Sequence, residues 1–233
     1  MTLRIAVFGV GRLGREIIAL APARNAEIVA SFGRSAAATA DALRDSAADV
    51  AIDVSVAEAV ERNVATCLTV GVPIVVGVTG WHALTARVLQ RVTQHNGGVL
   101  IAPNFSVGAT LFTAAVADAS RRFSAALGFD AAIVETHHAM KKDAPSGTAR
   151  SLAEVVRESR GSDVPVSSVR VGHVPGVHTL VLDAAFEQVT LTHEARDRRV
   201  FADGALLAAR WMRGRTGSWT MADVVRDLTG DAQ

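Results

Sequence analysis

The N-terminal half of the chain alternates short, almost unbroken apolar runs with longer Ala-rich segments, and this alternation constrains the fold more than any other feature. Runs that stay apolar at successive residues are typical of strands covered on both faces in a parallel sheet. Such strands are predicted at Arg4–Phe8, Glu27–Phe32, Val50–Asp53, Pro73–Val76 and Val99–Ile101. Helices are predicted between them at Leu13–Leu20, Ala36–Asp45, Val56–Val70 and Trp81–Thr93. Strands that alternate with helices predict a doubly wound α/β domain.

The second half of the chain has a different pattern, in which polar and apolar residues alternate as they do in half-exposed antiparallel strands. These strands are predicted at Val166–Val171, His178–Ala184 and Gln188–His193, with a turn at Pro175-Gly176. Helices are predicted at Thr148–Glu158, Phe201–Met212 and Thr220–Leu228, the last with Thr220 and Asp223 placed like a capping box. We therefore expect an α+β unit followed by C-terminal helices.

The composition excludes several classes of function. Among 233 residues, 24 Lys and Arg balance 23 Asp and Glu, so bulk charge gives no reason to expect a nucleic-acid or anionic-membrane partner. The single cysteine, Cys67, excludes an internal disulfide and a multi-cysteine zinc site, and no metal-site spacing is present. No apolar run approaches the roughly 20 residues that span a bilayer. Glycines break the N-terminal apolar run and no cleavage site follows, so we expect a cytoplasmic protein.

A glycine-rich motif follows the first predicted strand. Gly9, Gly11 and Gly14 form Gly-x-Gly-x-x-Gly immediately before a predicted helix. In this order the first glycine allows a tight turn, the second lets backbone amides approach a pyrophosphate, and the third permits close packing of helix on strand. The free N–H groups at the helix start then face the anion. The motif predicts dinucleotide binding, and the alternative is an ordinary glycine-rich turn between strand and helix.

The end of the second predicted strand favours a phosphorylated cofactor. An Asp or Glu about 20 residues past the glycines would accept a hydrogen bond from the ribose 2′-hydroxyl of NAD. The sequence has Gly33, Arg34 and Ser35 there instead, and Arg34 with Ser35 can receive a 2′-phosphate. The alternative is that Arg34 is a solvated loop residue. We therefore expect NADPH to be accepted at least as well as NADH.

A predicted helix start within residues 136–149 can bind an anion. Ser146 is predicted as the N-cap, so that Gly147 and Thr148 lie in the first turn. The exposed amides of this turn, together with the helix dipole, favour a carboxylate or a phosphate. Lys141 adds a full positive charge nearby.

Two histidines precede this helix start. His137 and His138 end an apolar strand, and histidine is a proton donor that titrates near neutrality. Because successive strand residues face opposite sides, we expect at most one of them to point into a given site. Proton donor, cation and anion-binding amides thus fall in one short segment, which indicates a site for an acidic substrate. The alternative is an ordinary capped helix preceded by surface or packed histidines.

The stretch His137–Ala149 reads His-His-x-x-Lys-x-Asp-Ala-Pro-Ser-Gly-Thr-Ala. It resembles the signature of the dihydrodipicolinate reductase family, also called 4-hydroxy-tetrahydrodipicolinate reductase. The resemblance extends over nearly the whole chain. It includes the glycine loop, Ile52–Ser55, Gly77–Gly80, Ala102–Gly108 and the later residues Arg170, His178, Glu187, His193, Arg198, Phe201, Gly204 and Ala205.

The resemblance implies a role for each matched position. His137 and Lys141 are expected to be catalytic, with His137 donating or helping to deliver a proton. The residues expected to bind the substrate carboxylates are His138, Ser146, Gly147 and Thr148. The expected cofactor-binding residues are Gly9, Gly11, Arg12, Leu13, Gly14, Arg34, Ser55, Gly77, Thr79, Asn104, Phe105 and Arg198.

The chain departs from the family pattern at a few positions. Gly33 stands where some members carry an acidic residue, which weakens the case for NADH. Val54 replaces the usual Phe and Val78 replaces the first Thr of Gly-Thr-Thr-Gly, and both changes are expected to leave backbone contacts intact. At 233 residues the chain is short for the family, so trimmed loops are expected.

The resemblance also implies a fold, a reaction and an assembly. We expect a Rossmann-like dinucleotide-binding domain over residues 1–104 and 202–233, with an inserted α+β substrate-binding and oligomerisation domain over 105–201. The implied reaction is NAD(P)H-dependent reduction of 4-hydroxy-tetrahydrodipicolinate to tetrahydrodipicolinate in the diaminopimelate route to lysine, with a proton from His137 or water. The expected partners are a small dicarboxylate and further copies of the chain in a homotetramer. The alternatives are another two-domain Rossmann dehydrogenase of amino acids and a non-catalytic dinucleotide-sensing protein.

Overall fold

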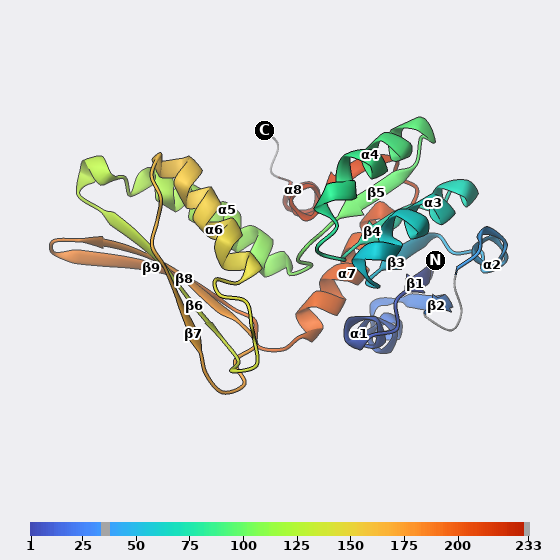
Figure 1. Ribbon diagram of the computed structural model, residues 1–233, viewed down its shortest axis with the longest axis horizontal. Coiled ribbons are helices and arrows are strands. Elements are labelled where there is room, and N and C mark those ends of the chain that lie inside the picture. The colour runs from blue at the N-terminus through green and yellow to red at the C-terminus, as the bar shows by residue number, and fades with distance from the viewer. Residues whose placement is uncertain (34–37, 231–233) are drawn as a thin grey trace. The chain divides into compact units, whose positions relative to one another are not determined.

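The computed structural model describes residues 1–33 and 38–230, and the chain divides into two compact units (Figure 1). Unit 1 comprises Met1–Val107 and the segment from Arg199 onward, and unit 2 comprises Gly108–Arg198. The chain thus passes from unit 1 to unit 2 after Val107 and returns to unit 1 after Arg198. From the sequence, these domain boundaries are expected after residues 104 and 201. None of the described helices is long and apolar enough to cross a membrane.

The described part of unit 1 contains a six-stranded parallel sheet in the order β10-β5-β4-β3-β1-β2 (Figure 1). Its strands are β1 (Leu3–Phe8), β2 (Ala26–Phe32), β3 (Val50–Asp53), β4 (Ile74–Val76), β5 (Gly98–Ile101) and β10 (Gly217–Thr220). The predicted parallel sheet is confirmed, but the sequence pattern does not predict β10. That strand is short and largely polar, and it lies at the sheet edge, where it pairs only with β5.

Successive residues of β1 from Ile5 to Phe8 pack into different cores, which explains why this strand is apolar except at the exposed Arg4. Leu3, Ile5 and Val7 belong to one buried cluster, and Ala6 and Phe8 belong to the other. The helices of unit 1 are α1 (Arg12–Leu20), α2 (Ala40–Asp45), α3 (Val60–Val70), α4 (Thr85–Gln94), α7 (Arg199–Met212) and α8 (Met221–Thr229), with 3₁₀ turns η1 (Ala21–Arg24), η2 (Ala57–Ala59) and η3 (His82–Leu84).

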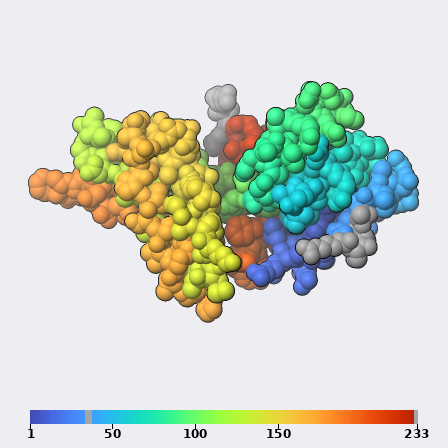
Figure 2. All heavy atoms as spheres, viewed as in Figure 1, coloured from blue at the N-terminus to red at the C-terminus, as the bar shows by residue number. Residues whose placement is uncertain are grey.

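The helices cover both faces of this sheet. The cluster that contains Ile5 includes residues of α1, α7 and α8, and the cluster that contains Phe8 includes residues of α2, α3 and α4. In the space-filling view, the teal and green segment that carries α3 and α4 covers much of the visible surface of unit 1 (Figure 2). Unit 1 is therefore a Rossmann-like α/β domain.

Unit 2 packs two helices on one face of a four-stranded mixed sheet (Figure 1). Its elements are α5 (Val107–Arg122), η4 (Ala125–Leu127), β6 (Asp130–His137), α6 (Gly147–Arg160), β7 (Val166–Arg170), β8 (Val177–Ala184) and β9 (Glu187–Glu194). The strand order is β7-β6-β8-β9, in which β6 and β7 are parallel and the other pairs are antiparallel. The predicted second domain with a mixed sheet is confirmed.

The sequence pattern does not predict α5. This segment contains Gly108, Thr110 and Thr113, which favour a helix less than Ala or Leu does. The packed face of the helix carries Phe112 and Val116, which belong to the core of unit 2. Tertiary packing therefore stabilises a helix that local propensity only weakly favours.

Candidate active site

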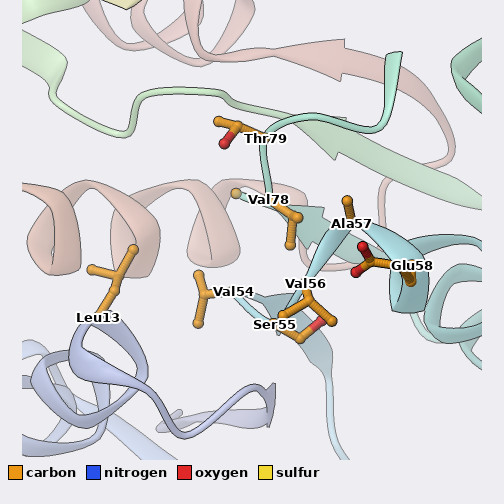
Figure 3. A pocket seen from close by; sticks show the side chains of 9 residues that line it. Leu13, Val54, Ser55, Val56, Ala57, Glu58, Val78 and Thr79 are labelled. Carbon is orange, nitrogen blue, oxygen red and sulfur yellow. The ribbon is translucent and has the colours of Figure 1, made fainter. Parts of the chain in front are cut away.

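The carboxyl ends of β3 and β4 and the start of α1 surround a cavity of about 310 Å³ in unit 1 (Figure 3). The cavity is lined by Leu13, Val54, Ser55, Val56, Ala57, Glu58, Gly77, Val78 and Thr79. In this sheet β1 pairs with β2 on one side and with β3 on the other, so the strand order reverses at β1. Open α/β sheets bind ligands outside the carboxyl ends of their strands at such a reversal. The cavity therefore lies where a dinucleotide is expected.

The glycine loop fits closely around the end of β3. Gly9 has a φ of +96°, and a Cβ there would lie 2.6 Å from the Cα of Ser55. A Cβ at Gly14 would lie 2.0 Å from the carbonyl oxygen of Gly9. Gly11 differs, because nothing lies within 4 Å of the position of its missing Cβ, and it caps α1 without a side-chain hydrogen bond. The helix start is thus open toward an approaching anion, as phosphate binding requires.

A buried carboxylate, Asp53, organises the end of β3 beside the cavity. It accepts hydrogen bonds from the amide and hydroxyl of Ser55 at 3.0 and 2.5 Å and from Nδ2 of Asn63 at 2.9 Å. Burial raises the pKa of Asp53, and these hydrogen bonds act against that rise. The network fixes Ser55 next to Gly9 and so shapes the wall of the cavity.

Phe105 packs against glycines on two other segments. A Cβ at Gly77 would lie 2.2 Å from the Phe105 ring, and a Cβ at Gly204 would lie 1.8 Å from the Phe105 carbonyl oxygen. Phe105 is 2% exposed, so it supports the cavity-lining loop at Gly77 from behind. Oδ1 of the neighbouring Asn104 accepts a hydrogen bond from the Ser106 amide at 2.9 Å.

Unit 1 brings together most of the predicted cofactor-binding residues that the structure describes. The cavity is lined by four of them, Leu13, Ser55, Gly77 and Thr79. The loop beside it is shaped by Gly9 and Gly14. Arg12 is exposed at the start of α1. Gly33 is exposed at the end of β2. Arg34 and Ser35, on which the preference for NADPH depends, lie outside the described residues.

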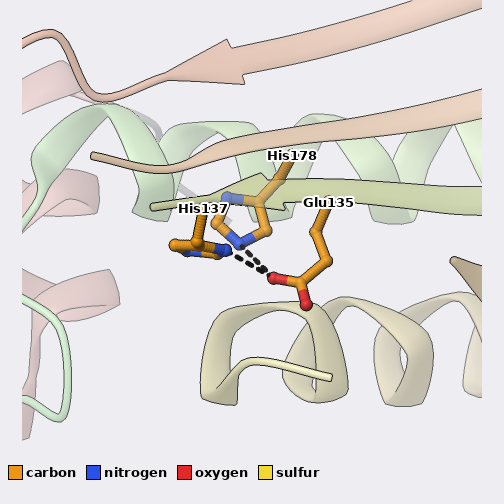
Figure 4. A group of neighbouring side chains, drawn as sticks. All are labelled: Glu135, His137 and His178. Atoms are coloured by element: carbon orange, nitrogen blue, oxygen red, sulfur yellow. Dashed lines mark ion pairs between the residues drawn. The ribbon is translucent and has the colours of Figure 1, made fainter. Parts of the chain in front are cut away.

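A second group of candidate side chains lies on the helix-covered face of the sheet in unit 2 (Figure 4). Glu135 and His137 are two residues apart on β6, so both side chains point to this face. The antiparallel register places His178 of β8 opposite Glu135, and the parallel register places Arg170 of β7 opposite His137. Strand pairing therefore gathers two buried histidines around one buried carboxylate.

The two oxygens of the Glu135 carboxylate contact different sets of groups. Oε1 accepts hydrogen bonds from Nη2 of Arg170 at 2.7 Å and from the Ser146 amide at 3.1 Å. Oε2 lies 2.7 Å from Nδ1 of His137 and 3.9 Å from Nε2 of His178 (Figure 4). The rings of His137 and His178 meet edge to face, with centroids 5.1 Å apart.

These contacts determine the charge states of the cluster. Burial alone would raise the pKa of Glu135, but hydrogen bonds from Ser168, Arg170 and Ser146 outweigh it and lower that pKa from 4.5 to about 2. Burial, assisted by the charge of His137, lowers the pKa of His178 to about 4. Burial also lowers the pKa of His137, although Glu135 acts in the opposite direction. Near neutral pH the cluster therefore holds an ionised carboxylate and two mostly neutral imidazoles.

The start of α6 joins this cluster through Ser146. The predicted N-cap is present, because its hydroxyl accepts a hydrogen bond from the Ala149 amide at 3.1 Å. The same hydroxyl lies 3.2 Å from Nε2 of His178, and the Ser146 amide donates to Glu135. The polar groups of Ser146 are thus engaged inside the protein, and the contact with substrate expected from the sequence stays a prediction. Gly147, which follows at the first helical position, is exposed.

The other predicted substrate-binding side chains lie nearer the surface. Nζ of Lys141 is 2.7 Å from Oδ1 of Asp143, and the Lys141 side chain is 23% exposed. His138 is half-buried, and its Nε2 lies 3.3 Å from Nη2 of Arg198. Of the two adjacent histidines, only His137 belongs to the buried cluster with Glu135 and His178, as the strand alternation predicts.

A metal ion fits this cluster poorly. Glu135, His137 and His178 each offer one ligand atom, and these atoms lie within 4.8 Å of one another. Two ligands of a tetrahedral zinc ion are about 3.4 Å apart, given bond lengths of about 2.1 Å. Nδ1 of His137 and Oε2 of Glu135 are only 2.7 Å apart, and Arg170 occupies the other carboxylate oxygen. The separation favours direct contact between imidazole and carboxylate.

Sequence reasoning missed Glu135, Arg170 and His178 as members of the site. One local signal was available, because Glu135 interrupts an apolar strand two residues before His137 and must share its face. The other two residues depend on strand register, which joins positions 35 or more residues apart and leaves no local pattern.

Comparison with known proteins gives one consistent result. Two family models match the chain, dihydrodipicolinate reductase N-terminus over residues 3–105 and dihydrodipicolinate reductase C-terminus over residues 108–225. The 4-hydroxy-tetrahydrodipicolinate reductase of Christiangramia forsetii is 32% identical over 97% of this chain and 99% of its own length. The enzyme of the same name from Gluconobacter oxydans is 41% identical over 73% of this chain and 74% of its own.

Solved structures agree in fold. A dipicolinate-bound dihydrodipicolinate reductase from Paenisporosarcina sp. TG-14 superposes with a TM-score of 0.82, covering 94% of this chain and 98% of that one at 22% identity. A probable dehydrogenase from Thermotoga maritima gives a TM-score of 0.63 at 11% identity, covering 97% of this chain and 93% of that one. At these identities the likeness concerns the fold alone.

Proposed function

The chain belongs to the dihydrodipicolinate reductase family, and from that premise we propose that it reduces 4-hydroxy-tetrahydrodipicolinate to tetrahydrodipicolinate with a nicotinamide cofactor. Membership makes the chain an oxidoreductase of lysine biosynthesis. The observation that carries the proposal is that both halves of one family match consecutive parts of the chain, including the segment from His137 to Thr148.

The residues of unit 1 fit a nicotinamide dinucleotide. The open amides at Gly11 and the start of α1 would hold the pyrophosphate, and the cavity beside Ser55, Gly77 and Thr79 would take the adjoining part of the cofactor. When bound, the reduced nicotinamide supplies a hydride from its C4. NADPH is the preferred cofactor in this proposal, because Gly33 offers no carboxylate to a ribose 2′-hydroxyl and Arg34 offers a cation to a 2′-phosphate.

Unit 2 supplies the groups that would bind a dianionic substrate. Lys141 and the first-turn amides of Gly147 and Thr148 would hold its carboxylates, with His138 nearby. The Paenisporosarcina relative has dipicolinate bound, a cyclic dicarboxylate of the same chemical class. A charge-assisted hydrogen bond contributes about 1.5–3 kcal/mol, so Lys141 is expected to be the largest single contributor to carboxylate binding.

His137 or water would supply the proton that completes the reduction. The lowered pKa of His137 leaves the free imidazole mostly neutral near pH 7. A bound dianion would favour the imidazolium form, because an opposite charge nearby raises the pKa of a histidine. His137 would then act as the general acid after the substrate has bound.

The assembly proposed for the chain is a homotetramer formed through the sheet of unit 2. Helices α5 and α6 cover only one face of that sheet (Figure 1). On β7, Val169 alternates with Arg170 and so lies on the other face, where it is 44% exposed. Val171, just past the end of β7, is 52% exposed. Light scattering on the purified protein would distinguish a tetramer from a monomer or dimer. The cytoplasmic location expected from the sequence stays a prediction.

Turnover with authentic substrate tests the proposed function. The purified protein is mixed with NADPH and with 4-hydroxy-tetrahydrodipicolinate generated enzymatically in the same vessel, and loss of the reduced nicotinamide absorbance is followed. Oxidation that depends on the substrate supports the proposal. Binding of NADPH without turnover would instead identify a dinucleotide-sensing protein. Faster turnover with an amino acid would identify a different Rossmann dehydrogenase.

A further inference from the structure

We propose that Glu135 is a positioning residue for proton transfer, which holds His137 by its Nδ1 side and leaves Nε2 as the nitrogen that carries and releases the proton. This inference rests on the proposed function, in which His137 is the proton donor. The hydroxyl group of the substrate first leaves as water, which forms a C=C bond conjugated to the imine, and the hydride then adds to one carbon of that bond. The proton step breaks the Nε2–H bond of the imidazolium and forms a C–H bond on the other carbon. The electron pair of the broken bond stays on Nε2, and solvent later returns the proton.

The Glu135 carboxylate is fixed from several directions. Its side chain is fully buried, and one oxygen is held by Arg170 at 2.7 Å and by the Ser146 amide at 3.1 Å. Arg170 also donates to the carbonyl oxygen of Asp143 at 2.6 Å. The carboxylate is therefore tied at once to β7, to the start of α6 and to the loop that carries Lys141. It cannot rotate without breaking its contacts with Arg170 and the Ser146 amide.

This fixed carboxylate presents its remaining oxygen to His137. The 2.7 Å approach of Oε2 to Nδ1 is a contact between two buried atoms, because the His137 side chain is only 9% exposed. Neither atom makes a well-aligned hydrogen bond within the described residues, so the contact is electrostatic. A negative carboxylate this close to Nδ1 favours the proton on that nitrogen. The neutral imidazole then has its lone pair on Nε2, and this nitrogen gains and loses the transferable proton.

Gly176 lies beside the opposite edge of the His137 ring. A Cβ at this position would lie 3.0 Å from Nε2 and 3.3 Å from Cδ2 of His137. Any larger residue there would force the ring to move, so Gly176 permits the ring position that Glu135 selects.

The charges around His137 give the effect of Glu135 a definite sign. Two positive groups face His137, namely Arg170 on β7 and Lys141 on the loop that follows β6. His178 on β8, which pairs with His193 on β9, becomes positive on protonation. Ser146 at the start of α6 is neutral. Of the groups that act on His137, Glu135 favours the imidazolium, whereas burial, Lys141 and Arg170 oppose it. Removing the negative charge from Glu135 must therefore make His137 harder to protonate.

The variant E135Q keeps the size of the side chain and removes its charge. We expect kcat to fall by about 10²-fold with a much smaller change in the KM for substrate. The pH above which kcat declines should move down by about one to three units, the usual effect of losing a close opposite charge. The matched control is E154Q, which removes an exposed carboxylate from α6 of the same unit and should behave like the wild type.

A readout that does not depend on turnover separates this inference from the proposed function. The protonation of His137 is followed by NMR of its ring protons, assigned by their absence in H137Q, in the wild type and in E135Q. The inference predicts a lower pKa for His137 in E135Q. It is overturned if that pKa is unchanged, even when activity is lost, because Glu135 would then have only a structural role. A wild type without reductase activity would refute the proposed function and leave the NMR comparison valid.

A second variant covers the case in which E135Q does not fold. E135D keeps the negative charge and shortens the side chain by one methylene. The inference predicts that E135D keeps a pKa of His137 closer to the wild type than any neutral variant does, with a reduced kcat from the lengthened contact. A wild-type kcat in E135D, or a His137 pKa lowered there by about one to three units although the charge is retained, would overturn the inference.

Discussion

The buried histidine His178 should make the protein lose stability in mild acid. Its side chain is 7% exposed, and burial lowers its pKa from 6.5 to about 4. Because the folded-state pKa lies below the unfolded value, the unfolded chain takes up the proton first as the pH falls. The contribution of His178 to the unfolding free energy is therefore fully retained above about pH 6.5 and is lost progressively between about pH 6.5 and 4.

The size of this loss follows from the same two values. Each pKa unit corresponds to about 1.4 kcal/mol, so a pKa that falls from 6.5 to about 4 corresponds to about 3 kcal/mol of unfolding free energy. This is a large part of the 5–15 kcal/mol that a typical protein has. Urea unfolding followed by circular dichroism at a series of pH values measures the effect directly.

The variant H178Q isolates the contribution of this one group. Its unfolding free energy should be lower than that of the wild type at pH 7, because the variant disturbs the contact with Ser146, but it should decline less steeply between pH 6.5 and 4. H173Q, which replaces an exposed histidine of the same unit, is the matched control and should follow the wild type. Equal slopes for H178Q and the wild type would refute the reasoning, because the buried imidazole would then not be the group that titrates.

Three further changes test other parts of the account. K141A should raise the KM for substrate by roughly ten- to a hundredfold, the equivalent of a charge-assisted hydrogen bond of about 1.5–3 kcal/mol. K142A, which changes the neighbouring exposed lysine, should leave the KM unchanged. Similar kinetics for the two variants would place the anion site elsewhere. G14A should abolish detectable NADPH binding by calorimetry or prevent folding, because its Cβ would lie 2.0 Å from the Gly9 carbonyl oxygen, and normal binding would show that the loop can shift. R34A should weaken NADPH more than NADH in a steady-state comparison, since only NADPH carries the 2′-phosphate, and equal losses would contradict that assignment.

The cofactor-binding unit could be predicted from sequence because its signals are local. The strand that ends at Phe8 is apolar except at the exposed Arg4, because residues such as Val7 and Phe8 enter different cores, and this pattern is visible without knowledge of the fold. The glycine loop is equally local, since Gly9 and Gly14 are required by contacts within or next to the loop itself. The strand of this unit that was missed is β10, which lies in the C-terminal part of the chain and pairs with the distant β5.

Unit 2 was only half predictable for the opposite reason. The positions of His137, Lys141 and the Ser146 cap follow from one continuous segment. The partners of His137 come from strand pairing, which sets Glu135 opposite His178 and His137 opposite Arg170. Register of this kind depends on how whole strands pack, so the sequence around His137 does not contain it.

Transfer of a labelled hydride tests the central claim most directly. The protein is incubated with enzymatically generated 4-hydroxy-tetrahydrodipicolinate and with NADPH that carries deuterium at both C4 positions, and the product is examined by mass spectrometry. The account predicts tetrahydrodipicolinate with one deuterium on carbon, formed at a rate that falls by about 10²–10⁴-fold in H137A. Unlabelled product, or bound cofactor that is never oxidised, would contradict it.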